Sequence, residues 1–249
     1  MVFGTVARSN RTYACLPAIV KRYLIHGRAV DVSEVRQRLA DIDTRLGSGI
    51  RKVDGSSISD EFHFTTSCIS TRLFDTRAMQ IVSKICEVQG VSRINVEALV
   101  GGMSAVVNSP VSATNRTADE LFAELGTSRR LDEIAVLRSR GLYLQLLRVM
   151  LHSEFQNKAL LTTCVEGLLG DIGSLSLLDI IDTLKCMLKL GVTHQGFTNA
   201  VVYLLPVLPC SDAELESLVE LLLTSGVDKE ADVEFLKNLV RYRSVLFPE

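Results

Sequence analysis

Apolar positions recur at helical spacing along most of the chain. Val35, Leu39, Ile42 and Leu46 follow one another at four- and three-residue intervals, which is the spacing of one face of a helix. A capping box precedes them at 31–34, and a glycine ends the pattern at residue 47. Polar caps before periodic apolar faces, ended in several cases by Gly or Pro, predict further helices at 75–90, 94–107, 117–126, 131–151, 157–169, 176–190, 193–205, 211–223 and 228–246.

Some stretches depart from this period. Residues 47–59 are rich in Gly and Ser and predict a loop, whereas the alternation at 61–65 predicts a short strand. Gly101 and Gly102 interrupt the helix at 94–107, and Gly141 predicts a bend in the helix at 131–151. The polar stretch at 108–116 is the best candidate for a domain boundary or an exposed loop. These features divide the chain into a possible targeting segment at 1–30, an N-terminal helical region at 31–109 and a helical-repeat region at 117–249.

The repeat is seen when the C-terminal half is laid over itself. A shift of 37 residues places Leu144, Leu147, Met150 and Leu151 on Ile181, Leu184, Met187 and Leu188, and a further shift of 35 places Ile180, Leu184, Met187 and Leu188 on Leu215, Val219, Leu222 and Leu223. Each unit of helix, tight turn and helix has an apolar face that it cannot bury alone. The pattern therefore predicts an all-α fold in which helix pairs stack as a short α-solenoid after irregular N-terminal helices. An irregular bundle of Leu-rich helices is the alternative.

Composition narrows the classes of partner. The 249 residues are 47% hydrophobic but only 6% aromatic, with no Trp, so the core is predicted to be mostly aliphatic, which suits packed helices. A net charge of −2 gives no global field toward nucleic acid or an anionic membrane, and no apolar run is long enough to predict membrane insertion. The six cysteines are scattered, and four of them, Cys15, Cys86, Cys164 and Cys186, fall in apolar helical patterns, which predicts structural thiols in a reducing compartment.

No motif predicts catalysis, a cofactor or a small-molecule substrate. The sequence has no phosphate-binding glycine loop, and the four histidines lie far apart without a partner at metal-ligand spacing. Gly167, Gly170 and Gly173 fall at the end of the helix predicted at 157–169 and before the one predicted at 176–190, so they are better explained by helix termination. The predicted sets of catalytic and metal-binding residues are therefore empty, and we expect a protein that is not an enzyme.

The first thirty residues carry an unusual charge bias. They include Arg8, Arg11, Lys21, Arg22 and Arg28, with no acidic residue before Asp31. This bias is typical of mitochondrial transit peptides and predicts a location in the mitochondrial matrix. The alternative is that the segment is the first amphipathic helix of the fold, and whether it is cleaved stays open.

One local cluster of arginines precedes and enters the repeat region. It consists of Arg129, Arg130, Arg138, Arg140 and Arg148. Because the planar guanidinium binds phosphate oxygens, we interpret Arg129, Arg130, Arg138 and Arg148 as candidate contacts to RNA phosphates. The alternatives are a solvated helix surface and a contact with an acidic partner, since no aromatic residues are interleaved to stack on bases.

The Leu-rich stretch at 178–192, LDIIDTLKCMLKLGV, resembles the helix that recurs in organellar helical-repeat proteins. Those are the octotricopeptide, FAST-kinase-like and pentatricopeptide-like families and the divergent repeat subunits of kinetoplastid mitochondrial RNA-processing complexes. The resemblance covers about residues 142–246 and is a pattern of helix ends and Leu positions. It implies a non-catalytic role in a mitochondrion, either associated with RNA or as a scaffold.

Two functional hypotheses follow. The first is a helical-repeat adaptor in a mitochondrial RNA–protein complex for RNA processing or editing, which binds other protein subunits and contacts RNA through the arginine cluster. The second is a structural accessory subunit of a mitochondrial ribosome or respiratory assembly that has no RNA binding of its own. The identity of the protein partners and the oligomeric state stay open.

Overall fold

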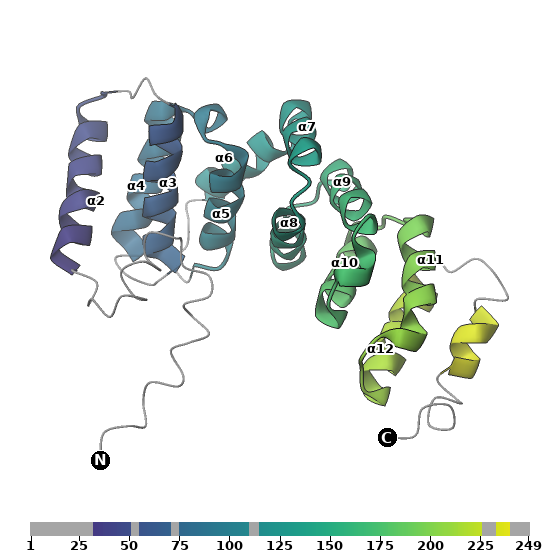
Figure 1. Ribbon diagram of the computed structural model, residues 1–249. Helices are drawn as coiled ribbons and strands as arrows, with labels where there is room; N and C mark the ends of the chain where they lie inside the picture. The colour runs from purple at the N-terminus through teal and green to yellow at the C-terminus, as the bar shows by residue number, and fades with distance from the viewer. Residues whose placement is uncertain (1–31, 51–54, 71–74, 110–114, 226–232, 240–249) are drawn as a thin grey trace, which may run out of the picture. The chain divides into compact units, whose positions relative to one another are not determined.

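The computed structural model describes residues 32–50, 55–70, 75–109, 115–225 and 233–239 (Figure 1). Within these ranges every regular element is a helix and there is no strand, which confirms the all-α prediction for this part of the chain. The predicted targeting segment at 1–30 lies outside the described residues, as do residues 228–232 and 240–246 of the helix predicted at 228–246. The chain divides into an N-terminal unit, Met1–Thr127, and a C-terminal unit, Ser128–Glu249.

The N-terminal unit alternates its helices between two sets. It contains α2 (Val32–Gly47), α3 (Gly55–Ser70), α4 (Asp75–Gln89), the 3-10 turn η2 (Val91–Arg93), α5 (Val96–Val107) and α6 (Asn115–Leu125). α2 packs on α4 and α4 on α6, while α3 packs on α5. Contacts of α3 with α4 and of α5 with α6 join the two sets. The periodic face predicted for α2 is the face that packs, since Leu39, Ile42 and Leu46 are buried.

The prediction of a strand at 61–65 was wrong, and the loop predicted at 47–59 ends earlier than expected. Residues 55–70 form the single helix α3. Ile58, Phe62 and Ile69 are buried at helical spacing. The hydroxyls of Ser59, Thr65, Thr66 and Ser67 donate to carbonyls one turn earlier, as Thr65 Oγ1 does to Glu61 at 2.8 Å. A helix that is buried on most sides lacks a clear polar face. Its apolar residues can then also fit the alternation of a strand, which explains the wrong prediction at 61–65.

The glycine pair at 101–102 does not interrupt α5. A Cβ atom at Gly102 would lie 2.2 Å from Cε1 of Phe62 and 3.1 Å from Cγ2 of Thr66, both on α3. A glycine is therefore needed at position 102 because the two helices approach closely there. Glycine in a helix costs about 1 kcal/mol relative to Ala, and the close packing of α3 on α5 requires this cost.

The boundary between the units differs from the regions drawn from the sequence. The polar stretch at 108–116 lies within the N-terminal unit, because α6 packs on α5 and α4. Ser83 Oγ and Thr117 Oγ1, which lie 2.7 Å apart, add a polar contact between α4 and α6. The unit ends instead at Thr127, so residues 117–125 belong with the N-terminal helices.

The C-terminal unit again alternates its helices. Its elements are α7 (Ser128–Leu137), α8 (Arg140–His152), α9 (Lys158–Leu169), η3 (Ile172–Ser174), α10 (Leu177–Leu190), α11 (Gln195–Leu204), η4 (Leu205–Val207) and α12 (Asp212–Thr224), and residues 233–239 are also helical. α8 packs on α10 and α10 on α12, while α7 packs on α9 and α9 on α11. α9 contacts both α8 and α10 and so joins the two sets.

The helix predicted at 131–151 is two helices, and the break lies before Gly141. Arg138 has φ of 45°, which is outside the helical range, and Ser139 caps α8 by accepting a hydrogen bond from the backbone N of Leu142. The apolar period continues across the break, so the period alone does not mark it. A cap serine within a periodic segment is the signal that marks the start of α8.

Side-chain caps set the start of each helix from α8 to α12. Ser139, Asn157, Ser176, His194 and Ser211 each accept a hydrogen bond from a backbone N–H three residues later. Two of these caps are full capping boxes, in which Ser176 pairs with Asp179 and Ser211 pairs with Glu214. Ser139, Ser176 and Ser211 are 37 and 35 residues apart, the two shifts found in the sequence.

Candidate functional site

Two of the predicted RNA-contact arginines share one carboxylate on α7. Arg129 Nε lies 2.9 Å from Glu133 Oε1, and Arg130 Nη1 lies 2.6 Å from Glu133 Oε2. Desolvation raises the pKa of Glu133, but the hydrogen bonds from Arg130 and Arg129 more than offset it and leave this pKa below its ordinary value. The side chain of Arg129 is 67% exposed, whereas that of Arg130 is 2% exposed. A phosphate could reach Arg130 only after a rearrangement of the helix.

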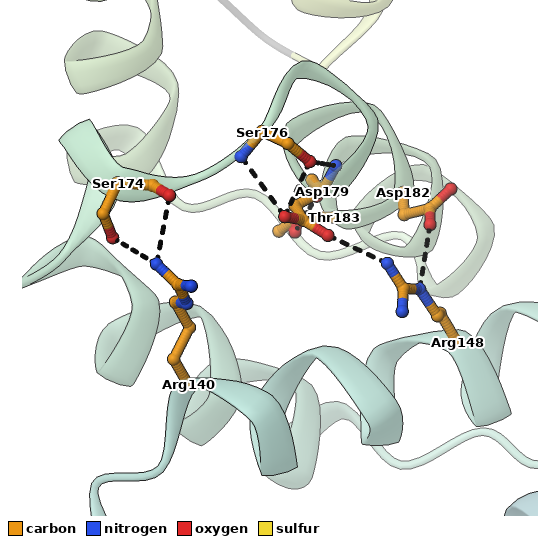
Figure 2. A network of polar contacts seen from close by, with 7 residues as sticks. All are labelled: Arg140, Arg148, Ser174, Ser176, Asp179, Asp182 and Thr183. Carbon is orange, nitrogen blue, oxygen red and sulfur yellow. Dashed lines mark hydrogen bonds and ion pairs between the residues drawn. The ribbon is translucent and has the colours of Figure 1, made fainter. Parts of the chain in front are cut away.

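Arg148 bridges α8 and α10 (Figure 2). Its Nη2 lies 2.9 Å from Oδ1 of Asp179 and its Nε lies 3.4 Å from Oδ2 of Asp182, both on α10. Asp179 also accepts hydrogen bonds from the backbone N and hydroxyl of Ser176, at 3.2 and 2.7 Å. The positive charge of Arg148 is thus compensated within the protein.

Two further basic side chains hold the ends of the same contact between helices. Arg140 Nη1, at the start of α8, donates to the carbonyl and hydroxyl oxygens of Ser174, at 3.0 and 2.7 Å (Figure 2). At the end of α10, Lys189 Nζ donates to the carbonyls of Met150 and Leu151, at 3.0 and 2.9 Å, and also to that of Ser153. These contacts pair start with start and end with end, so α8 and α10 run in the same direction. We call them the α8–α10 clamp.

The predicted cluster is therefore not one open basic patch. Arg130 is buried, and Arg148 and Arg140 belong to the α8–α10 clamp. Arg129 and Arg138 are exposed, and Arg129 is paired with Glu133. Direct contact of Arg129 or Arg138 with RNA stays a prediction.

The acidic partners in the clamp were not identified from the sequence. In the sequence, Asp179 and Asp182 fit a solvated helix face. Their neighbours along the chain do not indicate an ion pair with an arginine on another helix. The signal that could have found them is the repeat itself. Arg148 and Asp182 are 34 residues apart, as are Arg140 and Ser174, and this separation is close to the repeat period.

The buried thiols do not favour nucleophilic chemistry. Burial raises the pKa of Cys68 to about 11, of Cys86 to about 12 and of Cys186 to about 11, and it also raises the pKa of Cys164. At neutral pH these groups are thiols, and the thiolate is the reactive form. Among the described residues, no group of three or more His, Cys, Asp and Glu side chains is placed to hold a metal ion.

Comparisons of the chain with protein-family models, with curated proteins and with solved structures find no match. Within the part of the chain that the structure describes, no helix is both long and apolar enough to cross a membrane.

Proposed function

We propose that this protein is a non-catalytic helical-repeat adaptor that binds other protein subunits of a larger complex. The observation that carries the proposal is the packing of alternate helices from α7 to α12, with serine caps at the spacing of the sequence repeat. Helix pairs that pack in this way form an α-solenoid when their contacts continue in one direction, and the extended surface of a solenoid suits partner binding. The alternation of α2 to α6 in the N-terminal unit supports the same architecture there.

We further propose that the complex is a mitochondrial one. The support is the acid-free, Arg-containing sequence before Asp31, together with the resemblance of residues 178–192 to organellar repeat proteins. The location in the mitochondrial matrix and the role in RNA processing rest on these sequence features.

The compensated charges of the arginine cluster favour protein binding over direct RNA binding. Arg130 and Arg148 contact carboxylates of the same chain, so an RNA phosphate would have to compete with those ion pairs. The role of an accessory subunit without RNA binding of its own is therefore the second candidate. Both candidate functions use the same protein-binding surface. They differ in whether Arg129 and Arg138 contact RNA.

The test is purification of the tagged full chain from its own cells, with and without nuclease treatment. The proposal expects protein partners at constant stoichiometry that survive the nuclease. The RNA recovered without nuclease is then compared between the unmodified chain and a variant in which Arg129 and Arg138 are replaced by Gln. If the accessory-subunit role is correct, the amount of RNA is the same in both. If the variant loses RNA but keeps its protein partners, Arg129 and Arg138 contact RNA. Recovery of the chain alone, or loss of all protein partners on nuclease treatment, would contradict the adaptor function.

A further inference from the structure

Three helices of the C-terminal unit present side chains in one common register. α8, α10 and α12 begin after the cap serines Ser139, Ser176 and Ser211. The second, fifth, ninth and twelfth residues after each serine follow one another at intervals of three, four and three, so they lie on one side of their helix. None of these positions is buried on any of the three helices. We call this set of positions the shared stripe.

On α10 the shared stripe is mostly apolar although none of its residues is buried. It consists of Leu178, Ile181, Lys185 and Leu188, and Leu178 is 61% exposed. The core of the C-terminal unit is formed by other residues of α10, among them Ile180, Leu184 and Met187. Leu178 therefore adds little to the core, while Ile181 and Leu188 are half-buried and keep part of their surface free. An exposed apolar patch is typical of an interaction surface.

On α8 the shared stripe has the same character. Leu144 and Leu151 occupy the positions of Ile181 and Leu188, and Arg148 occupies that of Lys185. The α8–α10 clamp holds the two helices at this register, because Lys189 reaches the carbonyl of Leu151 while Arg148 reaches Asp182. The two stripes therefore form one surface with rows of aliphatic side chains.

On α12 the shared stripe changes charge. Glu216 and Glu220 occupy the positions of Ile181 and Lys185, while Leu223 keeps the aliphatic position. α12 carries four acidic residues and no basic residue, and one of the four, Glu214, is engaged with Ser211 in the capping box. Because the charge of Arg148 is compensated within the chain, the face has a mainly aliphatic side on α8 and α10, which also carries the exposed Lys185, and an acidic side on α12.

We propose that the shared stripe binds an amphipathic helix of a partner protein, with its apolar side on α8 and α10 and Lys or Arg residues on Glu216 and Glu220. This inference rests on the proposed adaptor function and specifies its binding surface and partner chemistry. A helix in a groove presents apolar anchors at intervals of three and four residues, which match rows of aliphatic side chains on neighbouring helices. RNA is the less favourable occupant, because its phosphates would meet the two exposed glutamates.

The test measures binding of three labelled probes to the full chain by fluorescence anisotropy. The probes are an amphipathic helical peptide of Leu and Lys, the same peptide with Glu in place of Lys, and a single-stranded RNA oligonucleotide. The Lys peptide is expected to bind the most tightly. In the double variant Glu216→Lys and Glu220→Lys its affinity should fall about tenfold or more and that of the Glu peptide should rise. The variant Leu178→Ser should weaken the Lys peptide without changing the melting temperature, since Leu178 is exposed.

The matched control is the double variant Glu154→Lys and Glu166→Lys. It makes the same change in net charge at exposed positions on the α8–α9 connection and on α9, so the affinity for the Lys peptide should stay within about twofold. Equal losses in both double variants would overturn the proposal, because they would indicate attraction to net charge alone. RNA as the tightest probe would also overturn it. A third contrary result is tight binding only by a chain ending at residue 239, since this would make the chain's own residues 240–249 the occupant.

The failure of this inference can be separated from failure of the proposed function. If the Glu216→Lys and Glu220→Lys variant retains its nuclease-resistant protein partners in cells, the shared stripe is not the binding surface and the adaptor function stands. If the unmodified chain has no such partners, the adaptor function itself fails.

Discussion

At the scale of single residues, the closest approach between α8 and α9 depends on Gly167. A Cβ atom there would lie 2.2 Å from Cε2 of Tyr143, and the hydroxyl of Tyr143 donates to the carbonyl of Ile134 on α7 at 3.3 Å. Gly167→Ala should therefore displace a ring that joins α8 to both α7 and α9, at a cost of about 1–3 kcal/mol in the free energy of unfolding. Urea denaturation measures it.

The control for Gly167 is Gly141→Ala on α8. A Cβ atom at Gly141 would meet nothing within 4 Å, so the substitution should be neutral or should stabilise the protein by up to about 1 kcal/mol through helix propensity. Equal stability of the two variants would show that the contact between Tyr143 and Gly167 is not close.

A second residue-scale prediction concerns the pH dependence of the N-terminal unit. Desolvation lowers the pKa of His63 below its ordinary 6.5, although the charge of Asp60 acts in the opposite direction. The unfolded chain therefore takes up the proton first as the pH falls. The stability contributed by neutral His63 is complete above about pH 6.5 and is lost as the pH falls through the lower folded pKa. In His63→Gln, the fall in melting temperature between pH 7 and pH 5 should be smaller than in the unmodified chain, and an identical pH profile would contradict this assignment.

At the scale of elements, α11 begins at an unusual cap. Nδ1 of His194 accepts a hydrogen bond from the backbone N of Phe197 at 3.1 Å. Because Asn caps helices well and Ala does not, His194→Asn should preserve stability while His194→Ala should lower it by about 0.5–2 kcal/mol. Thermal unfolding of the two variants side by side measures the difference. A loss in His194→Asn as large as in His194→Ala would show that something other than the cap matters at this position.

Elements were predictable where cap and period agreed, and the misses have definite causes. The helices at 176–190 and 211–223 were predicted to within a residue or two because a capping serine precedes the apolar face in each. A bend was predicted at Gly141, whereas the break between α7 and α8 lies at Arg138. Arg138 adopts a left-handed conformation, which a glycine would have indicated in the sequence but an arginine does not. α3 was missed because its Ser and Thr residues read as polar in the sequence although they are buried. Thr65 and Thr66 donate their hydroxyl hydrogen bonds to carbonyls of the same helix, so they can lie inside the unit.

At the scale of the whole molecule, the spacing of the capped helices α8, α10 and α12 was visible in the sequence, but the state of the arginines was not. The separations of the leucines and of the cap serines agree because both follow the same helix pairs. Charge density along the chain identified Arg129, Arg130, Arg138 and Arg148. Whether each charge is exposed depends on carboxylates one turn away, as at Glu133, or one repeat away, as at Asp182.

We propose that the face formed by the shared stripe of α8, α10 and α12 binds a protein partner. Lys185 lies on that face in the shared stripe, while Lys158, also exposed, begins α9. The most direct measurement is amine-reactive cross-linking and mass spectrometry of the complex purified from cells after nuclease treatment. Lys185 should form cross-links to another protein, and Lys158 should form few or none. Partner cross-links at Lys158 with none at Lys185, or no partner left to cross-link, would contradict it.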